Sequence, residues 1–244
     1  MAMQPADVPS VSAVNKAGDA LRVLIGKSGA LTSEEMNRAV HAIDVLVAWR
    51  AAHALPLATA TMGLKSRVQT AGCADGSRVS QRLKRIPTIL SKLHREPKME
   101  LGRMHDIGGC RVVLADLAQV YEVLDRYRTR PTSGGIKVQD YIEKPKPDGY
   151  RGVHVIVKYH GRRIEVQLRT QVQHEWAFTV ESVTARYGLA IKTGGGPLPV
   201  REWFQTVSEA MAVEEHGGTV DDDLLRRVST MREAAQPYLR GERR

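Results

Sequence analysis

The sequence has few cysteines and phenylalanines, and it lacks any long apolar run. Two cysteines and two phenylalanines occur among 244 residues, of which 42% are hydrophobic, so we expect a core of Val, Leu, Ile, Ala and Met. Two lone cysteines make no disulfide framework, and Cys110, in the apolar stretch IGGCRVVL, is predicted to be a buried thiol. No apolar run approaches the ~20 residues that a membrane helix needs, and the N-terminus lacks the parts of a signal peptide. These absences predict a cytoplasmic protein without a membrane partner.

Several common catalytic patterns are also missing. The chain contains no Walker A sequence and no GxSxG or HExxH pattern, and no histidine has a partner at zinc-ligand spacing. The formal charge is +9 and the pI about 9.7. This excess of basic residues indicates a polyanionic partner such as a nucleotide, RNA or DNA, although an ordinary solvated basic surface has the same composition.

Hydrophobic periodicity and turn residues predict an α+β or mixed α/β fold, not a regular series of βαβ units. Short alternating strands indicate a mixed β-sheet of about five strands, flanked by N- and C-terminal helices; four of them are expected at 111–114, 136–142, 153–159 and 162–169. Helices are expected at about 11–27, 32–55, 79–96, 117–130, 171–187, 200–215 and 220–238. Three units follow from this order: helical residues 1–60, a core at 61–192, and C-terminal helices at 197–244 after the Gly- and Pro-rich break at 194–199.

The second expected helix has a clear start signal. Thr32 and Glu35 form a capping box, and the helix is expected to stop before Pro56. Met36, Val40, Ile43, Val47 and Trp49 or Arg50 recur at helical spacing, which predicts that this stripe packs against the rest of the molecule.

Two carboxylates stand at the ends of expected strands. Glu165, Gln167 and Arg169 alternate along one strand, so their side chains point to the same face. Asp106 precedes Gly108, Gly109 and another strand. Together the two acids would suit Mg²⁺, although an Asp before a turn is more often a cap or turn former.

Two basic segments accompany these acids. Arg82, Arg85 and Lys92 fall on one face of the expected helix, as either a solvated surface or a platform for phosphate and base. The loop with Lys144, Lys146, Tyr150 and His154 is either an ordinary hairpin or a nucleotide loop whose exposed Tyr ring stacks on a base.

Taken in order, these segments resemble the synthetase domain of the RelA/SpoT family. The similarity is carried by RLKRIPTILSKL at 82–93, DIGGCR at 106–111, DYIEKPKPDGYRGVH at 140–154, and EVQLRT with HEWA within 165–177. The resemblance implies a nucleotidyltransferase-like fold and transfer of the β,γ-pyrophosphate of ATP to a ribose 3′-hydroxyl with Mg²⁺. The long members add a hydrolase domain and regulatory domains that do not fit in this length, so we expect a small stand-alone form.

The resemblance also implies roles for individual positions. Asp106 and Glu165 are the expected catalytic and metal-binding residues, with Glu165 activating the acceptor hydroxyl. The expected ATP-binding residues are Arg82, Lys84, Thr88, Lys92 and Arg111. The expected acceptor-binding residues are Lys144, Lys146, Tyr150, His154, Gln167 and Arg169. The chain departs from the family pattern at Thr88, where Ser is common, at Gly152, where Ser is common, and at Ser182, where small members often have His.

The acceptor is the open question at this level. Small members of the family either make guanosine tetra- or pentaphosphate from GDP or GTP, or act as toxins that modify the 3′-CCA end of tRNA and have an antitoxin partner. The basic residues crowded between Lys65 and Lys98 suit a tRNA backbone, so we place tRNA before GDP or GTP. A non-catalytic module that binds nucleotide or RNA is a second alternative, and the C-terminal helices offer a surface for an antitoxin or for a homo-oligomer.

Overall fold

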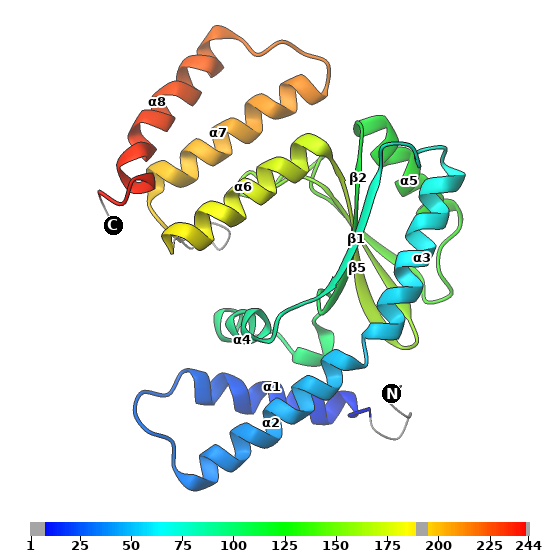
Figure 1. Ribbon diagram of the computed structural model, residues 1–244, viewed down its shortest axis with the longest axis vertical. Helices are drawn as coiled ribbons and strands as arrows, with labels where there is room; N and C mark the ends of the chain where they lie inside the picture. Colours follow the sequence, from blue (N-terminus) through cyan, green and yellow to red (C-terminus); the bar gives the residue numbers. More distant parts are fainter. Residues whose placement is uncertain (1–7, 189–194, 243–244) are drawn as a thin grey trace.

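A five-stranded mixed sheet forms the centre of the molecule (Figure 1). The computed structural model describes residues 8–188 and 195–242. The strands are β1 (Arg78–Leu83), β2 (Gly108–Leu114), β3 (Ile136–Asp140), β4 (Val153–Tyr159) and β5 (Arg162–Thr170). They lie in the order β1-β2-β5-β4-β3, in which only β2 and β5 run parallel. The predicted α+β class and mixed sheet are therefore confirmed.

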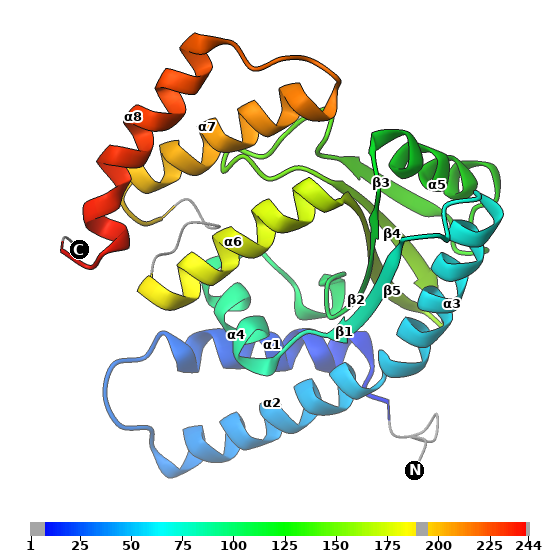
Figure 2. The same cartoon turned by 45° about the horizontal axis from the view of Figure 1, so that its top comes forward.

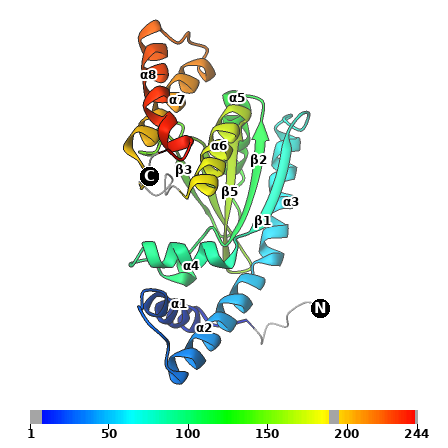
Figure 3. The same ribbon diagram turned by 60° about the vertical axis from the view of Figure 1, so that its left-hand side comes forward.

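Helices cover both faces of this sheet. The helices of the described residues are α1 (Val11–Ile25), α2 (Ser33–Ala51), α3 (Ala54–Thr70), α4 (Ile86–Arg95), α5 (Leu117–Thr129), α6 (Gln171–Tyr187), α7 (Leu198–Glu215) and α8 (Asp222–Leu239), with a short 3-10 helix η2 (Leu101–Arg103). Helices α3 and α5 lie on one face, while α4 and α6 lie on the other (Figures 1 and 3). None of the helices in the described part of the chain is long and apolar enough to cross a membrane.

Alternation along β5 separates the core from the polar face. Ile164, Val166 and Leu168 are buried and join the main hydrophobic cluster with α3 and α5. The residues between them therefore point to the opposite face, towards α4 and α6. Because side chains alternate along a strand, every second side chain of β5 lies on this second face, which we call the polar face of the sheet.

Two further hydrophobic clusters attach the terminal helices. The first joins α1 and α2 to α4 through Leu21, Leu46, Ile89 and Leu93. The second joins α6, α7 and α8 around Trp176, and Figure 2 shows α7 between α6 and α8. The terminal helices are thus packed onto helices of the polar face.

The predictions for the N-terminal helices were right at the start and wrong at the end. The Thr32–Glu35 capping box is present, but α2 ends at Ala51, and the missed helix α3 carries Pro56 in its first turn, where proline is tolerated. Met36, Val40 and Val47 are exposed, whereas Ala42, Leu46 and Trp49 are buried. The predicted packing stripe was right at Ile43 and Trp49, which pack into the cluster with α1 and α4, and wrong at the three exposed positions, because α2 is a peripheral helix that buries only a narrow face.

The expected basic helix at 79–96 was also wrong in its first part. Residues 78–83 form the edge strand β1, and α4 begins only at Ile86, with Pro87 in its first turn. Arg82 lies on β1 and Arg85 is the N-cap of α4, so they do not share a helical face with Lys92. Proline fits the start of a helix because its missing N–H has no partner there in any case.

Candidate active site on the polar face of the sheet

The strand register aligns the polar residues into a row across the sheet. Arg111 on β2 lies opposite Gln167 on β5, and Gln167 lies opposite His154 on β4. Glu165 and Arg169 flank Gln167 on the same face of β5. The predicted side chains from three strands therefore meet on one surface.

Four of these residues, Glu165, Gln167, Arg169 and His154, form a closed ring of hydrogen bonds together with Tyr150. The guanidinium of Arg169 donates from Nε to the Tyr150 hydroxyl at 3.0 Å and from Nη2 to Gln167 Oε1 at 2.9 Å. Gln167 Nε2 donates to Glu165 Oε2 at 2.6 Å. On the other side of the ring, Tyr150 Oη lies 2.5 Å from His154 Nε2, and His154 Nδ1 lies 3.2 Å from Glu165 Oε1. Two hydrogen-bonded paths thus lead from Arg169 to Glu165.

The ring keeps Glu165 ionised and Tyr150 protonated. Burial alone would raise the pKa of Glu165, but hydrogen bonds from His154 and Gln167 and the nearby His105 lower that pKa well below its usual value. Burial raises the pKa of Tyr150 to about 12, although Arg169 opposes the shift. The hydroxyl can therefore donate to His154 Nε2 while His154 Nδ1 donates to the carboxylate.

Asp106 lies between two lysines. Its Oδ2 accepts hydrogen bonds from Lys84 Nζ at 2.7 Å and Lys92 Nζ at 3.0 Å. Burial alone would raise the pKa of Asp106, but Lys84 and Lys92 outweigh it and hold that pKa below its ordinary value. The other oxygen, Oδ1, is buried and has no partner. Asp106 is thus an ionised group with one free oxygen.

His105 connects the two carboxylates. Its Nε2 lies 3.8 Å from Glu165 Oε1, and it directly precedes Asp106. Burial lowers the pKa of His105, whereas Glu165 and Asp106 both act to raise it. One imidazole therefore lies beside Glu165 and directly precedes Asp106, and both carboxylates act on its pKa.

The predicted ATP-binding residues lie on β1, β2 and α4, except Lys84, which lies in the connection between β1 and α4. Arg82 is exposed on β1 and lies opposite Gly109, and Thr88 is exposed in the first turn of α4. Arg111 is half-buried; burial and the nearby Arg169 and Arg82 lower its pKa. These residues, with Lys84 and Lys92, form a basic border on the β1 side of the carboxylates.

The acceptor loop differs from the prediction at its aromatic residue. Tyr150 was expected to present an exposed ring, but it is only 6% exposed, because its ring packs near Tyr141, His154 and Trp176. Lys146 Nζ lies 4.4 Å from the ring centre of Tyr141 and 4.9 Å from that of Tyr150. Burial lowers the pKa of Lys146. Lys144 is exposed.

Sequence analysis did not assign His105 or Tyr141 to the site. His105 adjoins Asp106, and Tyr141 lies at the end of β3 within the DYIEKPKP segment, so their positions beside predicted residues were the available signal. Tyr141 is half-buried and contacts His154 edge-on, with ring centres 5.1 Å apart. It is therefore more accessible than Tyr150.

The donor set fits Mg²⁺ at Asp106 better than at Glu165. A hard cation takes carboxylate oxygens, and Asp106 Oδ1 is a buried oxygen without a partner. Both oxygens of Glu165 already have partners in the ring. The described residues contain no group of three or more His, Cys, Asp or Glu side chains suited to a metal. The residues present thus suit an ion that takes most of its ligands from phosphates and water.

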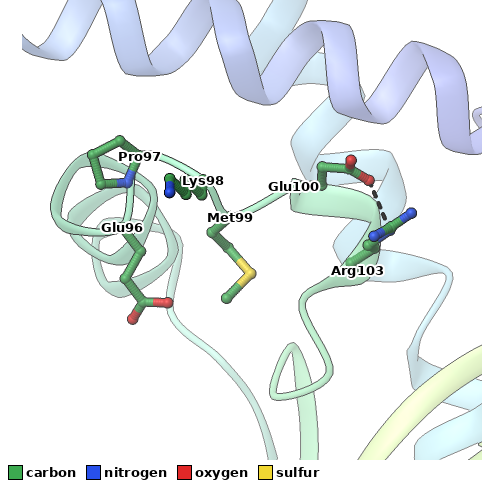
Figure 4. A pocket seen from close by; sticks show the side chains of 6 residues that line it. All are labelled: Glu96, Pro97, Lys98, Met99, Glu100 and Arg103. Carbon is green, nitrogen blue, oxygen red and sulfur yellow. Dashed lines mark ion pairs between the residues drawn. The ribbon is translucent and has the colours of Figure 1, made fainter.

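A pocket of about 470 Å³ lies elsewhere, between the end of α4 and η2 (Figure 4). Its lining consists of Glu96, Pro97, Lys98, Met99, Glu100 and Arg103. Glu100 and Arg103 pair with each other across 2.9 Å. None of the predicted site residues lines this pocket, so it is separate from the polar face described above.

The chain is similar in sequence to two known proteins of Bacillus subtilis. GTP pyrophosphokinase YwaC of Bacillus subtilis is 30% identical over 109 residues, which are 39% of this chain and 52% of YwaC. GTP pyrophosphokinase YjbM of the same organism is 30% identical over 142 residues, which are 54% of this chain and 65% of YjbM. The matches thus span about half to two thirds of these two relatives.

Solved structures support the fold. Small alarmone synthetase 1 from Bacillus subtilis, bound to its product pppGpp, superposes with a TM-score of 0.54 at 22% identity over 69% of this chain and 93% of that chain. Small alarmone synthetase 2 from the same organism gives 0.55 at 21% identity over 69% and 92%. The model of the region found in RelA and SpoT proteins matches residues 81–188, which hold both carboxylates and the hydrogen-bonded ring. Residues 81–188 of the chain are therefore similar to the region found in RelA and SpoT proteins.

Proposed function

We propose that this protein transfers the β,γ-pyrophosphate of ATP to the 3′-hydroxyl of GDP or GTP. The relatives named GTP pyrophosphokinases support the reaction class, and the solved relative bound to pppGpp supports a guanine nucleotide. The observation that carries the proposal is the meeting of Asp106 and Glu165 around His105 on one polar face, with lysines on one side and the ring on the other.

Each group has a role that follows from its surroundings. In the reaction, the acceptor 3′-oxygen bonds to the β-phosphorus of ATP, the bond from that phosphorus to the α–β bridging oxygen breaks, and AMP leaves. Glu165 takes the proton of the 3′-hydroxyl, since it is ionised and fixed by His154 and Gln167. Lys84 and Lys92 neutralise the phosphates of ATP, and Arg82 and Arg111 hold its base.

Asp106 would hold Mg²⁺ through its unpartnered Oδ1. When bound, the ion supplies charge neutralisation for the phosphates. Lys84 and Lys92 bind the other oxygen, Oδ2, so they hold the carboxylate in one orientation.

The structure gives less support to tRNA than the sequence did. Several basic residues that favoured tRNA do not gather on the polar face. Lys65 and Arg67 lie on α3, on the opposite face of the sheet. The Arg67 guanidinium lies over the Tyr127 ring at 4.3 Å and donates to the Arg130 carbonyl. The guanine-nucleotide alternative therefore replaces tRNA as the proposed acceptor.

The proposal is tested by following the label from [γ-³²P]ATP with GDP, GTP or deacylated tRNA in the presence of Mg²⁺. We expect label on GDP and GTP. Label confined to tRNA would refute the proposed acceptor. No label on any acceptor, with nucleotide binding retained, would favour the non-catalytic alternative.

A further inference from the structure

Helix α7, which lies outside the matched family region, is bonded to the acceptor loop. Ser208 Oγ donates to the Gly149 carbonyl at 2.5 Å and accepts from Arg151 Nε at 3.2 Å. A Cβ built on Gly149 would lie 3.1 Å from Gln205 Cα. The loop therefore packs directly against the backbone of α7, with no room for a side chain between them.

A buried ion pair continues this contact. Arg151 Nη1 lies 2.6 Å from Glu215 Oε2, and these side chains are only 4% and 7% exposed. Glu215 Oε1 also accepts a hydrogen bond from the Thr170 hydroxyl. Arg151 follows Tyr150 in the chain, and Thr170 follows Arg169. The carboxylate of Glu215 thus holds the residues that follow Tyr150 and Arg169, and these two side chains are hydrogen-bonded to each other.

We propose that Glu215 and Ser208 are positioning residues that fix the acceptor loop through Arg151, so that α7 controls how the acceptor is bound. The assignment to acceptor binding rests on the function proposed above, whereas the effect on the loop does not. The residues expected to hold ATP lie on β1, β2 and α4 and in the connection between β1 and α4, whereas the ion pair and hydrogen bond of Glu215 within the described residues go to Arg151 and Thr170. Loosening the clamp therefore weakens acceptor binding without weakening ATP binding.

The test compares Glu215→Gln, Arg151→Gln and the double variant with wild type. Glu214→Gln is the matched control, because Glu214 is the preceding residue of α7 and is exposed. In Glu215→Gln we expect KM for the acceptor to rise about tenfold, since part of the binding free energy of the acceptor is then spent on ordering the loosened loop. KM for ATP and kcat are expected to stay close to wild type, as they do in the control.

The double variant separates positioning from stability. Each single variant leaves one buried charge without its partner and lowers the unfolding temperature, whereas the double variant removes both charges and regains part of the loss. A positioning role predicts that acceptor KM stays raised in the double variant. If acceptor KM recovers together with the unfolding temperature, or if both KM values and kcat change in parallel, the clamp has no positioning role.

Hydrogen–deuterium exchange provides a readout that does not depend on activity. The amides of Lys146 and Gly149 are hydrogen-bonded within the loop, to the carbonyls of Tyr150 and Lys146, and they are expected to exchange faster in Glu215→Gln than in Glu214→Gln. Unchanged exchange would refute the clamp. If wild type transfers pyrophosphate to no guanine nucleotide, the proposed function fails, and the exchange data still decide whether α7 fixes the loop.

Discussion

Replacing Tyr150 with Phe tests the hydrogen-bonded ring by deleting one oxygen atom. Phe keeps the volume of the aromatic side chain, so the main loss of stability comes from the two buried partners of the hydroxyl. These are His154 Nε2 at 2.5 Å and Arg169 Nε at 3.0 Å. Arg169 is 5% exposed and His154 6%, so neither group regains full contact with water. Leaving a buried polar group unsatisfied costs ~1–3 kcal/mol, and more when it is charged. We expect Tyr150→Phe to lower the free energy of unfolding by about 3 kcal/mol.

The assay is equilibrium unfolding in urea together with thermal unfolding. A loss of about 3 kcal/mol corresponds to a decrease in Tm of roughly 6–12 °C for a protein of this size. Tyr121→Phe is the matched control, because Tyr121 lies on α5 and is 36% exposed, and we expect a change of less than about 1 kcal/mol. If Tyr150→Phe is as stable as the control, its hydroxyl is not shared between His154 and Arg169.

Two other predictions concern pH and the loop. Burial lowers the pKa of His53 to about 4, whereas in the unfolded chain this pKa is about 6.5. As pH falls from about 6.5 towards 4, the unfolded chain binds a proton that the folded chain does not bind, so the free energy of unfolding decreases by up to about 3 kcal/mol. Urea unfolding at several pH values should show this loss in wild type and a smaller loss in His53→Gln. An equal pH dependence of the free energy of unfolding in the two proteins would show that His53 is not the cause. Gly149→Ala should destabilise by about 2 kcal/mol, because φ is +87° and the new Cβ meets Ser208 Cβ at 3.1 Å. Gly135→Ala, at φ +72° with open space around it, should cost only the backbone strain of about 1 kcal/mol, and a smaller loss at Gly149 than at Gly135 would contradict the packing.

Much of the site could be predicted because its signals are local. Strict alternation in β5 placed Glu165, Gln167 and Arg169 on one face, and the capping box located the start of α2. The edge strand β1 was missed because it is largely exposed and carries no apolar alternation, so its charges fit a helix equally well. In such a segment only the pairing with β2 decides the structure.

The remaining errors arise from contacts between distant segments. The burial of Tyr150 depends on Trp176 and on α7, which covers Gly149. The pair of Arg151 with Glu215 likewise joins a loop to a helix outside the family region. The chain near Tyr150 reads as an exposed basic loop, and nothing in that stretch identifies the helix that covers it.

The most direct test of the central claim is the rate of pyrophosphate transfer in Asp106→Asn and Glu165→Gln. Both are measured at saturating ATP and GDP beside Asp44→Asn, whose residue is exposed on α2, with circular dichroism to confirm folding. We predict that each site variant loses about 10²-fold or more while Asp44→Asn keeps the wild-type rate. A folded Asp106→Asn or Glu165→Gln protein with near wild-type transfer would contradict the account.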